Sequence, residues 1–110
     1  MPDISQAERR RRLLHQEILD FTGHPAFFQP PTSPSPKLTY PCTVYNLVRI
    51  QSAYANNKTY RNTRLYRITY ITKDPGDPLI DAFVEHFQMI SMSNHFTSDG
   101  LNHYIYDLYY

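Results

Sequence analysis

The chain has 110 residues, a length that favours one domain with a modest core. Hydrophobic residues make up 41% and charged residues 19%, which is typical of a globular chain and excludes a disordered one. The net charge of +1 hides a segregation, because residues 21–73 hold seven Lys or Arg and no acid, whereas residues 74–110 hold six acids and no Lys or Arg. The two segments are therefore expected either to pair within one fold or to meet head to tail between copies.

Cysteine content and hydropathy narrow the class of protein further. Cys42 is the single cysteine, which excludes an internal disulfide and a cysteine-based zinc site. The N-terminal sequence MPDISQAERRRRLLHQEIL lacks the apolar core of a signal peptide, and no apolar run approaches the ~20 residues of a membrane helix. We therefore expect a soluble protein made in the cytoplasm, with no membrane partner.

The N-terminal segment carries helix signals. The sequence SQAE at residues 5–8 has the spacing of a capping box, in which Ser5 accepts from the N–H of Glu8 and Glu8 reaches back. Apolar residues then recur at helical spacing, and Gly23 follows as a stop signal. These signals predict a helix over residues 6–21 with one apolar face, formed by Ala7, Leu14, Ile18 and Phe21.

A proline-rich segment follows this helix. Five prolines lie between residues 30 and 41, which excludes a helix and a central strand. We predict an extended linker over residues 29–41. Just before the linker, Phe27 and Phe28 form either a short strand or a hydrophobic plug.

Two β-rich segments then predict an antiparallel hairpin over residues 42–73. The first strand is expected at 42–50. The second, at 64–72, alternates between two faces, and its apolar face is formed by Tyr66, Ile68 and Tyr70. The polar segment between the strands is interpreted as a long basic loop with Asn56 and Asn57 as its turn.

The last third of the chain predicts a helix and a second hairpin. In the turn cluster KDPGDP, Asp77 is placed to cap a helix over residues 78–88. The apolar face of this helix is expected to comprise Ile80, Phe83, Val84 and Phe87. The Asp-Gly pair at 99–100 predicts a tight turn in a C-terminal hairpin over 89–110, whose last strand would fill the core with Leu101, Ile105 and Leu108.

The order of these elements predicts the fold class. A single domain over residues 1–110 is expected to be α+β, with a small antiparallel sheet of about four strands and the order α-β-β-α-β-β. Both helices would pack on one face of that sheet.

Catalytic and metal-binding patterns are weak. The three glycines do not form a phosphate loop, and no Gly-x-Ser-x-Gly elbow is present. His95 and His103, with Asp99 in the turn between them, have the chemistry of a metal site, but ordinary polar residues of a hairpin are the favoured interpretation. We therefore expect no enzymatic activity, no catalytic residue, no metal and no cofactor.

Several segments taken in order resemble one known family. They are FFQPP at 27–31, YPCTVYNL at 40–47, YANNKTY at 54–60, YRITYITKDPGDP at 66–78 and FTSDGLNHYIYDLYY at 96–110. This succession resembles the small tail terminator proteins of long-tailed bacteriophages, also called tail completion or neck proteins. The likeness covers roughly residues 13–110, and its most specific part is the closing LNH…LYY. The chain departs from the family in having SDGLNH in place of ADNLNH, in its proline content at 30–41 and in the basic run Arg9–Arg12.

The resemblance implies a structural role in the virion. Tail terminators form a ring, usually of six copies, on the head-proximal end of the tail tube. The ring ends addition of tube subunits and offers a docking surface to the head. The expected partners are therefore further copies of the chain, the major tail tube protein, the head-completion or connector protein and, by passive contact in the lumen, phage DNA. The expected location is the neck of the virion, at the head–tail junction.

Charge and aromatic content suggest which residues join neighbouring subunits. The predicted interface combines a basic hairpin, an acidic helix stripe and two tyrosines: Arg49, Lys58, Arg61, Arg64, Arg67, Asp77, Asp81, Glu85, Tyr104 and Tyr106. Lys58 and Arg61 are also candidates for facing DNA in the lumen. Two alternatives stay open: another neck, head-closure or minor tail protein, and a small nucleic-acid-binding module that uses the basic and aromatic residues of 49–73.

Overall fold

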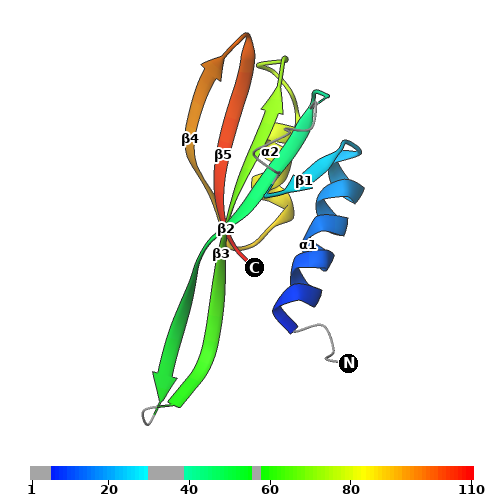
Figure 1. The fold of residues 1–110 in the computed structure, drawn as a ribbon. Coiled ribbons are helices and arrows are strands. Elements are labelled where there is room, and N and C mark those ends of the chain that lie inside the picture. The colour runs from blue at the N-terminus through cyan, green and yellow to red at the C-terminus, as the bar shows by residue number, and fades with distance from the viewer. Residues whose placement is uncertain (1–5, 30–38, 56–57) are drawn as a thin grey trace.

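The computed structural model describes residues 6–29, 39–55 and 58–110, and the side chains of 55 and 58–62 lie outside that description. Two helices and five strands make up the described chain (Figure 1). In chain order they are α1 (Gln6–Thr22), β1 (Ala26–Phe28), β2 (Cys42–Ala55), β3 (Lys58–Thr72), α2 (Leu79–His86), β4 (Ile90–Ser98) and β5 (Leu101–Tyr109). The predicted capping box at Ser5, most of the predicted linker and the predicted Asn56–Asn57 turn lie outside the described residues.

The five strands form one mixed sheet in the order β1-β2-β3-β5-β4. β1 runs parallel to β2, and every other neighbouring pair is antiparallel. The α+β class is confirmed, but the prediction of about four antiparallel strands is wrong, because the three residues after the α1 turn pair with Thr43–Tyr45 and add a fifth strand. Of the two possibilities for Phe27 and Phe28, the strand is correct.

Helix α1 follows its predicted face closely. Leu14 and Ile18 are fully buried against the sheet, because residues four apart lie on the same face of a helix. The helix ends one residue later than predicted, at Thr22, and Gly23 then adopts a positive φ of 69°. Its N–H donates to the Leu19 carbonyl at 3.0 Å, so glycine closes this helix as the sequence predicts.

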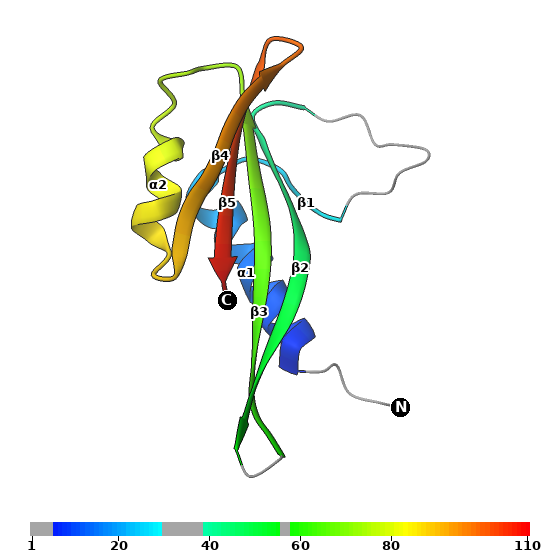
Figure 2. The ribbon, with the colours of Figure 1, turned by 90° about the vertical axis from the view of Figure 1, so that its left-hand side faces the viewer.

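Both helices cover the same face of the sheet (Figures 1 and 2). Phe83 of α2 packs between Tyr70 and Tyr106, and the ring of Phe21 on α1 meets it edge-on at 4.9 Å between centroids. The predicted helix over 78–88 is shorter in the structure, because Phe87 turns to an extended conformation and enters the core. Val84 is exposed, so its predicted place on the apolar face is wrong.

The core contains five buried tyrosines, including Tyr104. The hydroxyl groups of four of them, which have at most 1% exposed surface, make hydrogen bonds: Tyr45, Tyr66, Tyr70 and Tyr106. Each hydroxyl makes a hydrogen bond, to His15 and Arg11, to Arg64, to Asp77 and to the Ile80 carbonyl respectively. A buried tyrosine keeps its apolar contribution only when its polar tip is satisfied in this way. The tyrosine content of the chain is therefore explained mainly by the core.

The side chains of β5 that face the core differ from the prediction. Tyr104, Tyr106 and Leu108 face the helices, whereas Ile105 lies on the opposite face. Successive side chains of a strand alternate between faces, so Leu101 and Ile105 cannot share a face with Leu108. The Asp-Gly turn itself is confirmed, with positive φ at both Asp99 (54°) and Gly100 (75°).

The β2–β3 hairpin is much longer than predicted. Its ladder continues to Ala55 and Lys58, so the segment interpreted as a long basic loop is mostly strand. Beyond the part of β3 that pairs with β5, this ribbon projects from the body of the molecule (Figure 1), and the longest dimension of the chain is 51 Å. We call the projecting part, residues 49–64, the arm. The described side chains of the arm, 49–54 and 63–64, are exposed or half-buried, and the sequence of the arm shows no alternation of apolar and polar positions to mark it as strand.

Candidate functional site

The basic candidates for the interface lie on or near the arm. Arg49 donates to the Tyr109 hydroxyl at 3.4 Å, and Arg64 donates to the Tyr66 hydroxyl at 3.1 Å. Lys58 and Arg61 have backbone positions on β3 within the arm, but their side chains lie outside the described part of the structure. The arm therefore carries basic residues at both ends and no acid.

The prediction that Tyr104 and Tyr106 face a neighbouring subunit is wrong. Their exposed fractions are 7% and 1%, and both side chains point toward the helices. The Tyr106 hydroxyl donates to the Ile80 carbonyl of α2 at 2.6 Å. These rings belong to the core because they lie at every second position of β5, on the same face as the buried Leu108.

Of the three acidic candidates for the interface, Asp77 is bonded within the chain, whereas Asp81 and Glu85 face solvent. Asp77 accepts hydrogen bonds from the Tyr70 hydroxyl (2.6 Å), the Thr72 hydroxyl (3.0 Å) and the Leu79 N–H (2.9 Å). Burial opposes ionisation of Asp77, but the hydrogen bonds from Tyr70, Leu79 and Thr72 outweigh it and lower its pKa. Asp81 and Glu85 are exposed on α2 instead. Only these last two are placed to meet another molecule.

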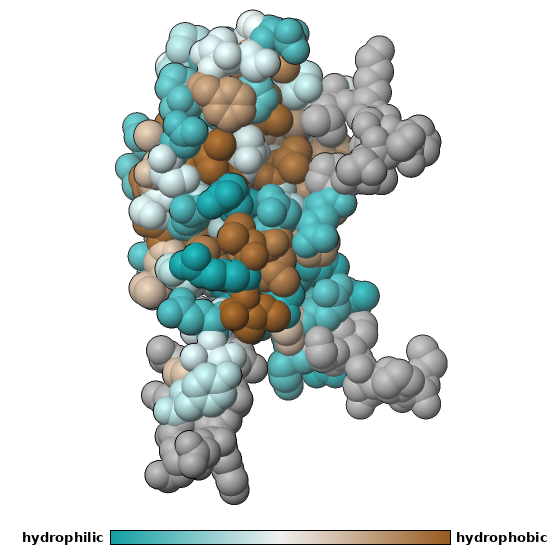
Figure 3. All heavy atoms as spheres, turned by 60° about the vertical axis from the view of Figure 1, so that its left-hand side comes forward, coloured by the Kyte–Doolittle hydropathy of each residue, from teal (hydrophilic) through white to brown (hydrophobic). Residues whose placement is uncertain are grey.

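The face of the sheet turned away from the helices carries a mixed surface (Figure 3). Apolar side chains gather over its middle, interrupted by hydrophilic ones. At the centre Arg67 of β3 pairs with Asp107 of β5 at 3.2 Å. Across the described residues this is the one ion pair that joins the basic segment 21–73 to the acidic segment 74–110. Arg67 is therefore already paired within the chain.

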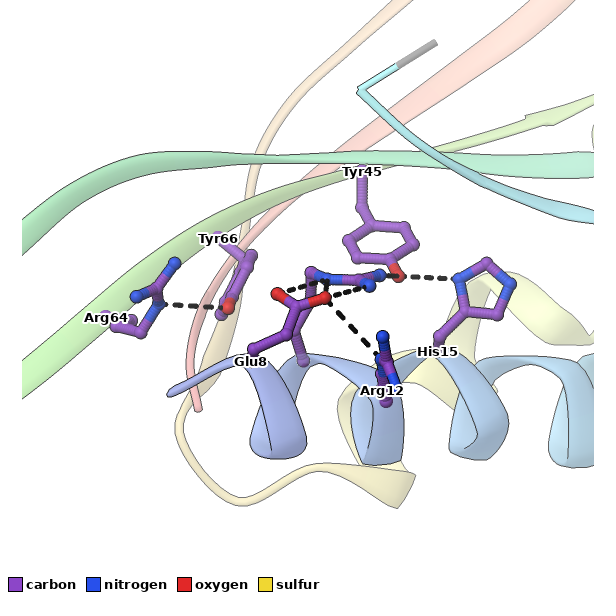
Figure 4. A network of polar contacts seen from close by, with 7 residues as sticks. Glu8, Arg12, His15, Tyr45, Arg64 and Tyr66 are labelled. Atoms are coloured by element: carbon purple, nitrogen blue, oxygen red, sulfur yellow. Dashed lines mark hydrogen bonds and ion pairs between the residues drawn. The ribbon is translucent and has the colours of Figure 1, made fainter. Parts of the chain in front are cut away.

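A polar network joins α1 to the sheet and accounts for part of the basic run (Figure 4). Arg11 donates to both oxygens of Glu8 and to the Tyr45 hydroxyl, while Arg12 lies 3.6 Å from Glu8. The hydrogen bond from Arg11 lowers the pKa of Glu8. The Nδ1 atom of His15 lies 2.6 Å from the same Tyr45 hydroxyl.

This network was missed by sequence reasoning. The sequence predicts a capping box for Glu8, which stays a prediction because Ser5 lies outside the described residues, and the Glu8 carboxylate also binds Arg11 one turn ahead on the same helix. The i,i+3 and i,i+4 spacing of Glu8 to Arg11 and Arg12 is visible in the sequence and was the signal for it. Its partner Tyr45 is 34 residues away, and only the folded chain brings it near.

Two open grooves flank Arg10 and Tyr110. The first has a volume of about 360 Å³ and lies between α1, the end of α2 and the end of β5. The second, of about 270 Å³, lies between the start of α1, Ile50 and Arg64. Arg10 sits over the Tyr110 ring at 4.8 Å, and the Tyr110 hydroxyl donates to Glu17, so Tyr110 contacts both of these charged side chains. Neither groove brings a nucleophile and a base together.

The histidines of the C-terminal hairpin do not converge. His95 stacks on Tyr104 at 4.4 Å, and His103 stacks on Phe96 at 4.5 Å. Their register places the two histidines on opposite faces of the hairpin. Within the described ranges, no group of three or more His, Cys, Asp or Glu has an arrangement that could hold a metal ion.

Comparison with known proteins adds no relative. No protein-family model, no curated protein and no solved structure matches the chain. Neither described helix is long and apolar enough to cross a membrane.

Proposed function

We propose that the chain is a structural virion protein that forms a ring on the head-proximal end of a phage tail tube, ends tube growth and provides the docking surface for the head connector. The observation that carries this proposal is the opposite charge of two parts of the folded chain. The arm is basic, and the outward face of α2 is acidic. The succession of motifs described above supplies the family to which such a ring would belong.

A ring needs two different, complementary surfaces on each subunit, because head-to-tail contacts close only when one surface meets the other. Arg49, Lys58, Arg61 and Arg64 belong to the arm, which lies on the β2 and β3 side of the sheet. Asp81 and Glu85 project from α2, which packs beside β4 at the other edge. Charges of this kind would set the register and choice of partner more than the affinity.

The same charges are compatible with a lumen through which DNA passes. Lys58 and Arg61 are the lumen candidates, near the tip of the arm. Phosphate binding strengthens with each cation that neutralises a phosphate, so a dense basic lining would hold DNA in place. Scattered cations allow passive contact, which ejection requires. The proposed partners are other copies, the major tail tube protein and the head-completion protein, at the neck of the virion.

A charge-reversal experiment tests the ring. Light scattering over a salt series, followed by imaging, should detect a ring-sized species that weakens as salt rises. Changing Lys58 and Arg61 to Glu should weaken it further. Lys73→Glu is the control for one such reversal, because it reverses a single charge at an exposed residue just beyond the end of β3 remote from the arm. The protein should also cap purified tail tubes and stop their growth, and a failure to cap them would refute the proposed function.

One observation favours a second candidate, a small nucleic-acid-binding module. Tyr54 on the arm is 68% exposed, close in sequence to Arg49, and exposed aromatic rings among cations suit stacking with bases. Strong, salt-dependent binding of single-stranded DNA by the monomer would support this candidate. Another neck or head-closure protein would also form a ring, but it would bind the head connector without capping the tube.

A further inference from the structure

Strand β4 is an unprotected edge of the sheet. It pairs with β5 on one side and with no other described strand. Its nine residues, ISMSNHFTS, include no charge and no proline, and Met92 and Phe96 are 51% and 43% exposed. Proteins usually protect long edge strands with charges, prolines or a covering element, because an open edge pairs readily with another strand.

The hydrogen-bond phase shows which backbone groups of β4 face outward. The Tyr109 N–H donates to the Met89 carbonyl, whereas the Tyr110 N–H donates to Arg64 on the other side. The odd-numbered residues of β5 therefore bond toward β4, since backbone groups alternate in direction along a strand. His95 and Thr97 pair with even-numbered residues of β5, so their N–H groups point away from β5. The His95 N–H donates to the Asn94 side chain at 2.8 Å, and the Thr97 N–H faces the open side.

The opposite side of the sheet has a second open edge. β1 covers β2 only at Thr43–Tyr45. From Asn46 to Gln51 no described strand lies beside β2 on that side, and Ile50 is 51% exposed. One backbone group of this edge, the Leu47 N–H, donates to the Gln29 side chain at 3.2 Å. Arg49 belongs to this edge, whereas Asp81 and Glu85 lie on α2 next to β4. The two open edges are therefore at opposite ends of the strand order and are flanked by opposite charges.

We propose that copies of this chain associate head to tail by pairing β4 of one copy with the 46–51 edge of β2 in the next. This rests on the proposed function in that it names the interface of the proposed ring. Three antiparallel steps separate β2 from β4, so β4 runs opposite to β2. A rotation about an axis along the strands thus brings the two edges together as an antiparallel pair, and the sheet continues from copy to copy.

The register of this pairing follows from β1. When the residue pairing is followed across the sheet from β4 to β2, Ile90 lies in line with Leu47, and Phe96 lies in line with Cys42. Because β1 already occupies Thr43–Tyr45, the incoming β4 must shift toward the arm. Such a stagger between neighbouring strands is the normal consequence of strand tilt in a closed sheet. It also brings Asp81 and Glu85 of one copy toward the basic arm of the next.

Proline substitution at an outward N–H tests the edge. Thr97→Pro removes an N–H that faces away from β5, so the β4–β5 ladder keeps its bonds. Thr97→Ala is the matched control, since both variants lose the side-chain bond to Asn102 (3.2 Å) and only proline loses the N–H. We expect light scattering to show association at least about tenfold weaker for the proline variant and unchanged for the alanine variant. Circular dichroism should show both variants folded.

Amide exchange tests the same edge in the unmodified chain. The N–H group of Thr97 should exchange slowly at concentrations where the chain is associated and fast where it is monomeric. A chain that stays monomeric at every concentration overturns the inference, as does an associated chain in which this amide stays unprotected and proline has no effect. In both cases tube capping decides the proposed function separately. Association through this edge without capping would refute the proposed function and leave the interface standing.

Discussion

Replacing Asp77 by alanine should be among the most destabilising changes to any charged residue of this chain. Its carboxylate accepts three hydrogen bonds, from Tyr70, Thr72 and the N–H of Leu79. These bonds connect the end of β3 to the first turn of α2, so they fix where the helix begins. The Tyr70 side chain has no exposed surface, so its hydroxyl depends on this acceptor.

The size of the effect follows from the separate bonds. Leaving the buried Tyr70 hydroxyl without an acceptor costs about 1–3 kcal/mol, and losing the side-chain acceptor at the start of α2 costs about 0.5–2 kcal/mol. Because one carboxylate serves all the donors, these terms overlap, and we expect Asp77→Ala to lower the free energy of unfolding by about 3 kcal/mol. Asp74→Ala is the control, since Asp74 accepts one bond, from the exposed Gly76 N–H.

The effect should depend on pH in a defined direction. The pKa of Asp77 in the folded chain lies below its ordinary value of 3.8. The stability that the carboxylate contributes is therefore fully present above pH 3.8 and is lost as the pH falls through the lower, folded-state pKa. Urea unfolding followed by circular dichroism from pH 7 to pH 2 measures this, and the difference between the parent and Asp77→Ala should shrink at the acid end. A loss below 1 kcal/mol at pH 7, or a difference that does not change with pH, would refute the reasoning.

Three other changes test the core, the turn and the thiol. Ile18→Ala should cost about 2–5 kcal/mol in urea unfolding, because Ile18 is fully buried, whereas the exposed Leu13→Ala should cost under about 0.5 kcal/mol; equal losses would contradict the assigned face of α1. Gly100→Ala should cost about 1–2 kcal/mol from its φ of 75° alone, since no atom lies within 4 Å of an added Cβ, and a neutral result would argue against that turn. Burial raises the pKa of Cys42 to about 11, so a thiol reagent at pH 8 should label it only at the rate of unfolding, and immediate labelling would contradict its burial.

Local signals in the sequence predicted those features that depend on neighbouring residues. The Asp99–Gly100 turn and the Gly23 helix end were found because each needs a positive φ that few residues accept. The alternation at Tyr66, Ile68 and Tyr70 was found because the buried face of a strand repeats every second residue. Helix α1 was located to within one residue because its buried residues recur at the spacing of a helix turn.

Features that depend on distant partners were missed. β1 is a strand only because Thr43–Tyr45 lies beside it. No described side chain of the arm is buried, and its composition resembles a loop although its backbone forms a ladder. In β5 the apolar Ile105 was chosen for the core over the neighbouring tyrosines, yet the core accepts Tyr104 and Tyr106, and the Tyr106 hydroxyl reaches α2.

The position of the tyrosines changes what kind of interface the proposed ring can have. Aromatic residues are enriched at interfaces, and the sequence suggested that some tyrosines of the last strand serve there. The four fully buried tyrosines are instead committed to the core by their hydroxyl bonds. Among the described residues, what remains for a neighbour is backbone at two open edges, charges of opposite sign and a few exposed apolar or aromatic side chains, of which Tyr54 and Phe96 are the aromatic ones named above. Exposed charge pairs are screened by salt, whereas apolar contacts are not, so assembly of such a ring should weaken more steeply with salt than an aromatic interface would.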